Sequence, residues 1–185
     1  MVTGDPIVPG AAAVQEVKAY LRLEGDGEDG LVARLVASAA ELCERFTGRA
    51  LLARGFSETL APGAGAWVRL ARTPVRAITS VETVDAAGSA SSLAPSAYAV
   101  DIDANGDGWV RLTDAGGAKI VRVGYQAGVA ADWDQVPDAL AQGAVRLAAH
   151  FYLERDEGRQ RVPPAAVSAL WRPYRLLRIG ESAHV

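Results

Sequence analysis

The sequence is poor in cysteine, methionine, histidine and lysine. It has one cysteine, one methionine and two histidines in 185 residues, and arginine accounts for 17 of its 19 basic side chains. The single cysteine, Cys43, excludes a disulfide framework within the chain and a metal site built from several thiolates. We therefore expect the chain to be made in a reducing cytoplasm.

Long apolar runs are also missing. No stretch approaches ~20 consecutive apolar residues, the length that a transmembrane helix needs. The N-terminal segment MVTGDPIVPGAAAV has neither the basic start nor the apolar core of a secretory signal. We expect neither secretion nor a membrane partner.

An excess of positive charge is absent as well. The net charge is −3, half of the residues are apolar and 22% are charged. This composition is typical of a globular protein and not of a disordered chain. Because tight binding of nucleic acid usually requires a clear surplus of Lys and Arg, the charge balance argues against that role.

Two segments, 13–55 and 135–179, carry apolar residues at the spacing of amphipathic helices. The acidic turn at 25–30 predicts a helix that begins near Glu28, and Gly48 predicts its end. Pro137 and Asp138 suit the start of the later helix. The apolar positions of these helices are Val14, Val17, Leu21, Leu31, Val32, Leu35, Val36, Ala39, Leu42, Cys43, Phe46, Leu140, Ala144, Leu147, Ala148 and Phe151.

The intervening region changes to short stretches of β-branched and aromatic residues separated by Gly, Pro, Asp or Asn. Strands that form one small antiparallel sheet are predicted at 56–60, 67–70, 78–84, 98–102, 109–112 and 120–125, and hairpin turns at 85–88 and 105–108. The sequence therefore predicts an α+β fold. A small helical bundle is formed by the N- and C-terminal helices (13–55 and 135–179), with a central antiparallel β-rich insertion (56–134) and flexible ends (1–12 and 180–185).

One stretch has the spacing of a metal-binding loop. Asp101, Asp103, Asn105 and Asp107 alternate as in the first half of a calcium loop, but its twelfth position is Leu112 instead of Glu and its flanks are predicted strands. Asn and Gly at the tip of a hairpin explain the same residues. The sequence is therefore compatible with either a calcium site or a plain hairpin turn at these residues.

No catalytic motif stands out, and we predict no catalytic residues and no cofactor. His150 is the only histidine within a predicted helix, so a nucleophile–His pair would depend on long-range folding around it. A histidine on the helix surface is the simpler interpretation. Gly116 and Gly117 are not followed by the Lys-Ser/Thr of a phosphate loop.

The C-terminal helix combines an apolar face with arginine. Val167, Leu170, Trp171 and Tyr174 share helical spacing, and Arg172, Arg175 and Arg178 recur beside them. One interpretation is a helix packed on its own bundle with the arginines in solvent. The other is an interface, because Trp, Tyr and Arg dominate the energetics of protein–protein contacts. Pro173 should end or kink the helix.

Several segments together resemble one family. They are AYLRLEGDGEDGLVARLVASAAELCERFTGRAL (19–51), PVRAI (74–78), GYQAG (124–128), VPDALAQGAVRLAAHFYLER (136–155) and VPPAAVSALWRPYR (162–175). Their order and spacing resemble the head-to-tail connector, or adaptor, proteins of long-tailed phages and phage-derived gene transfer agents. The resemblance runs from about Val14 to Arg175.

The resemblance implies a structural role and no catalytic residues. It implies a homo-oligomeric ring, commonly dodecameric, assembled in the bacterial cytoplasm and docked beneath the portal protein. DNA would pass through the channel without sequence-specific binding, and a stopper or tail-completion protein would lie below. In such relatives the C-terminal segment reaches toward the portal, so the resemblance implies a portal or subunit interface at Trp171, Arg172, Tyr174, Arg175 and Arg178.

Three alternatives remain at this stage. A neighbouring neck component, such as a stopper, belongs to the same class. A stand-alone calcium- or ligand-binding module would be a monomer stabilised by its ligand. An enzyme would require a buried polar cluster around His150.

Overall fold

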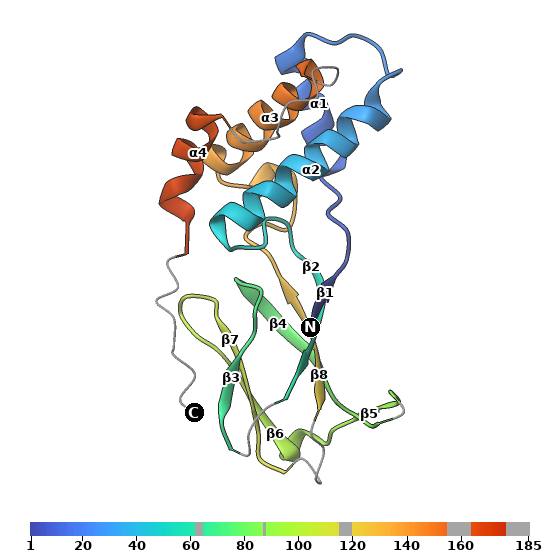
Figure 1. Cartoon of the computed structure of the whole chain (residues 1–185), viewed down its shortest axis with the longest axis vertical. Coiled ribbons are helices and arrows are strands. Elements are labelled where there is room, and N and C mark those ends of the chain that lie inside the picture. Colours follow the sequence, from blue (N-terminus) through green and yellow to red (C-terminus); the bar gives the residue numbers. More distant parts are fainter. Residues whose placement is uncertain (62–64, 87, 115–119, 155–163, 177–185) are drawn as a thin grey trace.

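The helices and the strands lie at opposite ends of an elongated molecule (Figure 1). A computed structural model describes residues 1–61, 65–86, 88–114, 120–154 and 164–176. Within them the helices are α1 (Gly10–Leu21), α2 (Asp29–Thr47), α3 (Asp138–Leu153) and α4 (Ala165–Trp171), with short 3-10 turns η1 (Pro95–Ala97), η2 (Trp133–Gln135) and η3 (Arg172–Tyr174). The strands are β1 (Val2–Gly4), β2 (Arg54–Leu60), β3 (Trp67–Arg69), β4 (Val75–Val84), β5 (Ala90–Ser92), β6 (Tyr98–Ile102), β7 (Gly108–Leu112) and β8 (Val121–Ala127). The predicted α+β fold is confirmed.

Helix α3 is the central element of the helical end, where it packs against α1, α2 and α4. Its predicted apolar face is buried at every position: Leu140, Ala144, Leu147, Ala148 and Phe151. Helix α2 begins after Glu28, and Gly48 ends it in the left-handed region with a φ of 75°. Glycine adopts this conformation without the steric cost of a side chain, so the sequence signal for the end of α2 was correct.

The strands form two antiparallel sheets, whereas one was predicted. The first has the order β1-β2-β8-β4-β5 and the second the order β3-β7-β6. All six predicted strands are present within a few residues, and the turns near 85–88 and 105–108 join β4 to β5 and β6 to β7. The buried faces of the two sheets share one apolar cluster that includes Leu70, Val81, Val110, Val123 and Tyr125. Period-two alternation indicates which face is buried, but it cannot say which strands pair.

The N-terminal segment differs from the prediction of a flexible end. Val2–Gly4 forms β1, antiparallel to β2, and the side chain of Ile7 is buried in the helical cluster. The physical reason is that β2 pairs with β8 on one side and leaves its other edge open to β1. A three-residue strand is too short to produce a period that sequence analysis can detect. Residues 180–185 lie outside the described part of the chain.

No helix among the described residues is long and apolar enough to cross a membrane.

Candidate functional site

The tryptophan predicted for an interface is a core residue. Trp171 is fully buried, its indole N–H donates to the carbonyl of Leu140 at 3.3 Å, and its ring lies 5.9 Å from that of Phe46. A Cβ at Gly143 would come within 2.1 Å of the indole nitrogen, so this glycine lets the ring lie directly on α3. The assignment of Trp171 to an external contact was therefore wrong, because its apolar surface is already covered by α2 and α3.

The residues after Trp171 turn outward: α4 ends at Trp171, and Pro173 lies in the 3-10 turn η3 that follows. Arg172 and Arg175 are exposed, and Tyr174 is half-buried. Leu176 N–H donates to Thr47 O at 2.8 Å, Arg49 Nε donates to Tyr174 O at 3.3 Å, and the Arg175 guanidinium lies 5.8 Å from the Phe46 ring centre. We call residues 172–176 the terminal segment. It is fixed across the end of α2, with its arginines in solvent, while Arg178 lies outside the described residues.

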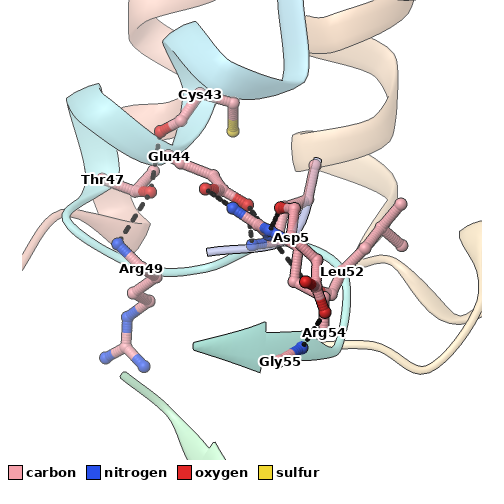
Figure 2. Close-up of polar contacts among 9 residues, drawn as sticks. Asp5, Cys43, Glu44, Thr47, Arg49, Leu52, Arg54 and Gly55 are labelled. Carbon is pink, nitrogen blue, oxygen red and sulfur yellow. Dashed lines mark hydrogen bonds and ion pairs between the residues drawn. The ribbon is translucent and has the colours of Figure 1, made fainter. Parts of the chain in front are cut away.

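A buried ion pair joins the helical end to the first sheet (Figure 2). Both guanidinium Nη atoms of Arg54 donate to the carboxylate of Glu44 at 2.7 Å, and the Glu44 side chain is only 6% exposed. Glu44 also accepts from Leu51 N–H at 2.7 Å, and Arg54 Nε donates to Asp5 O at 2.9 Å. The pair thus connects α2, the start of β2 and the N-terminal segment.

This pair was not predicted from the sequence, although a signal was present. Glu44 follows Ala40 by four residues and Cys43 by one, so it lies on the apolar face of α2. A carboxylate there must be paired when it is buried. Since Glu44 and Arg54 satisfy one another and hold three segments together, the pair stabilises the fold and leaves no free charge for chemistry.

A second buried carboxylate is equally occupied. Glu58 accepts from the Tyr125 hydroxyl at 3.0 Å and from Ala71 N–H at 2.8 Å. Burial, followed by the nearby Glu58 charge, raises the pKa of Tyr125 above its usual value. The hydroxyl therefore stays protonated and donates to Glu58, which ties β2 and β8 to the loop before β4.

The calcium candidate is built as a hairpin turn. One carboxylate oxygen of Asp103 accepts from the backbone N–H groups of Asn105 and Asp107, at 2.8 and 3.0 Å, and the other accepts from Trp109 Nε1 at 3.3 Å. The backbone bond from Asp107 is the main reason why the pKa of Asp103 lies below its usual range. Asp107 pairs with Arg69 at 3.2 Å, and Asp101 is exposed on β6. Among the described residues no group of three or more His, Cys, Asp or Glu side chains could hold a metal ion.

His150 and the single thiol, Cys43, lie on different helices, α3 and α2. His150 Nε2 pairs with Glu154 at 3.2 Å within the last turn of α3. Cys43 is buried in α2, where burial and then the Glu44 charge raise the pKa of its thiol to about 12. A thiol that stays protonated is a poor nucleophile.

A surface groove lies beside the start of α1. It has a volume of about 560 Å³ and is lined by apolar residues of the N-terminal segment and by Asp132 and Asp134, both exposed, on either side of Trp133. Trp133 Nε1 donates to Glu16 of α1 at 2.8 Å, which fixes η2 against α1. Arg54 also lines the groove, but Glu44 neutralises it. We call this feature the acidic groove.

Comparison with known proteins identifies relatives of the whole chain. The sequence model of the head completion protein family matches residues 12–162. No curated protein matched. Three solved structures contain similar chains, and in each comparison the match covers 98% of this chain and 98% of the other. The first, described as the neck of an empty GTA particle computed with C6 symmetry, is 28% identical with a TM-score of 0.78. The others are a virion of a native gene transfer agent (29%, 0.76) and the neck of a native GTA particle computed with C12 symmetry (27%, 0.72).

Proposed function

The chain belongs to the head completion protein family, and from this membership we propose that it is the head–tail connector, or adaptor, of a phage-like particle. A structural role in the neck rests on the similarity to neck chains over 98% of both lengths. Beyond that role, we propose that identical copies form a ring, dodecameric by analogy with C12 symmetry, which docks on the portal protein and receives a stopper or tail-completion protein on its other side.

The contacts of the described residues agree with a structural role. The buried carboxylates Glu44 and Glu58 are each satisfied within the fold, and Cys43 is protonated and enclosed. The exposed parts of the terminal segment and the acidic groove are instead placed where another protein can reach them. A net charge of −3 suits a conduit through which DNA passes without tight binding.

The function is tested by deleting the gene in cells that make the particle, with a plasmid copy of the full chain as the control. Without the chain we expect DNA-filled heads and separate tails, and assembly in the cytoplasm should resume when the chain is supplied. An image of the neck should then show a ring of this chain in contact with the portal. Normal tailed particles in the deletion strain would refute the proposal, and a ring one layer further from the capsid would identify a stopper.

A further inference from the structure

A ring of identical copies requires two different surfaces on each copy. Each contact joins one surface of a subunit to another surface of its neighbour, and closure needs these surfaces on different sides of the molecule. The following inference rests on the proposed ring. Two surfaces of the described chain have the placement and the opposite charge that such a contact needs.

The first surface is the terminal segment, whose exposed charged side chains are all basic. Arg172 and Arg175 are exposed, and no acidic residue occurs between 164 and 176. The hydrogen bonds from Arg49 to Tyr174 O and from Leu176 to Thr47 O fix the backbone before any partner binds. A surface that is already ordered loses little conformational entropy on association. Arg and Tyr are also the residue types that carry most energy at protein interfaces.

The second surface is the acidic groove. Asp132 and Asp134 are both exposed at its edge, while Val8, which is 74% exposed, and Ala11 supply apolar surface beside them. On the adjoining side of α1, the exposed Glu16 accepts from Trp133 Nε1 and adds a third acidic side chain, while Lys18 is turned toward Asp29. The groove thus offers acids for arginine and an apolar floor for the rings and aliphatic chains between the arginines.

The two surfaces lie on different flanks of the helical end. Helix α3 packs against both α1, which borders the groove, and α4, which leads into the terminal segment. Figure 1 shows α4 at the left edge of this end and α1 on the right, partly behind α2. One copy can therefore present its groove to one neighbour and its terminal segment to the other.

We infer that residues 172–176 of each copy dock into the acidic groove of the next copy around the ring. Complementary charge fixes the direction of the contact and speeds association, and juxtaposed like charges suppress it. The partner is a second copy of this chain, since both charge patterns are present on one subunit and a head-to-tail contact between them satisfies both.

The test exchanges the charges of the two surfaces in the full chain. One variant carries Asp132→Lys and Asp134→Lys, and the other carries Arg172→Glu and Arg175→Glu. Each is supplied to the deletion strain alone, both are supplied together, and a fourth strain receives all four substitutions in one chain. Thermal unfolding checks that each variant is folded, and Glu24→Lys with Asp26→Lys, on the exposed turn after α1, is the matched control.

Each two-residue variant alone should lower the yield of tailed particles by about 100-fold or more, because every contact in its ring places like charges together. Supplying both variants should restore the yield to within about 10-fold of wild type. When the two variants alternate around the ring, every groove meets a terminal segment of opposite charge. The four-residue variant should also recover, and the control should not change. Loss of yield that neither combination rescues would overturn the inference and indicate a portal contact. Unchanged yield in both variants would overturn it as well. Both results leave the proposed function intact, because that depends on the deletion strain itself.

Discussion

Because α4 lies so close to α3, one substitution is predicted to have opposite effects on stability in two different backgrounds. Replacing Gly143 with alanine should destabilise the wild-type protein. The same replacement should stabilise a protein that already carries Trp171→Ala. Both effects follow from the position of the indole, which lies directly over the Cα of Gly143.

The magnitudes come from the contacts at this position. A Cβ on residue 143 would meet Trp171 at 2.1, 2.8 and 2.9 Å, all shorter than real Cβ contacts allow. Overpacking costs about 1–3 kcal/mol, and an approach as short as 2.1 Å places this substitution in the upper half of that range, about 2–3 kcal/mol. Alanine gains up to ~1 kcal/mol over glycine inside a helix. We expect a net loss of about 1–2 kcal/mol in the wild-type protein. Trp171→Ala alone should cost about 3–5 kcal/mol, and adding Gly143→Ala to it should recover ~1 kcal/mol.

The assay is urea unfolding of the four proteins, followed by far-UV circular dichroism so that loss of a tryptophan does not alter the signal. The cycle should give a coupling energy of about 2–3 kcal/mol, within the range for residues in direct contact. Arg172→Ala, on an exposed neighbour, should change stability by less than ~0.5 kcal/mol. Equal effects of Gly143→Ala in both backgrounds would refute the packing described here.

Three further predictions concern buried groups. Glu44→Gln should cost about 3–5 kcal/mol because it leaves the largely buried Arg54 guanidinium without its carboxylate partner. Glu41→Gln, on the exposed side of α2, should cost less than ~0.5 kcal/mol, and similar costs of the two substitutions in urea unfolding would contradict this. The raised pKa of Cys43, about 12 against ~8.5 in an unfolded chain, means that its contribution to stability is present below pH ~8.5 and is lost as the pH rises toward 12. At pH 9 a disulfide reagent should therefore label the native thiol only as fast as the protein unfolds, and immediate labelling would show that the thiol is accessible. Two shortened chains test the contribution of Trp171: one ends at Leu176 and keeps this residue, and the other ends at Leu170 and lacks it. The chain ending at Leu170 should have a melting temperature at least roughly 6 °C below that of the chain ending at Leu176, because it loses a fully buried indole. Equal melting temperatures would mean that Trp171 contributes little to stability.

Local patterns predicted the helices and most strands because they depend on neighbours in sequence. The face of α3 follows from residues three and four apart, and the end of α2 follows from the backbone freedom of Gly48. The hairpin between β6 and β7 follows from Asn105 and Gly106 at its tip. The same patterns said nothing about strand order, so two sheets were predicted as one.

The candidate site was less predictable than the fold. Trp171 is of a residue type that is common at protein interfaces. Only the packing of its ring against Gly143, 28 residues earlier in the chain, shows that it belongs to the core. The acidic groove combines the N-terminal segment with residues 131–135, and no spacing in the sequence relates them. The partner of Glu44 could not be predicted either, because Arg54 lies ten residues away on another element.

The sequence by itself determined the helical periods, the turns and the segments that carry the family resemblance, since each depends on residues that are close along the chain. Tertiary structure alone decided which aromatic residues are covered, which charges are paired and which remain exposed. Burial and pairing depend on what the rest of the chain places around a side chain. For this reason Trp171 and its neighbours Arg172 and Arg175 have similar sequence signals but opposite roles, since Trp171 lies inside the core and the two arginines lie on the surface.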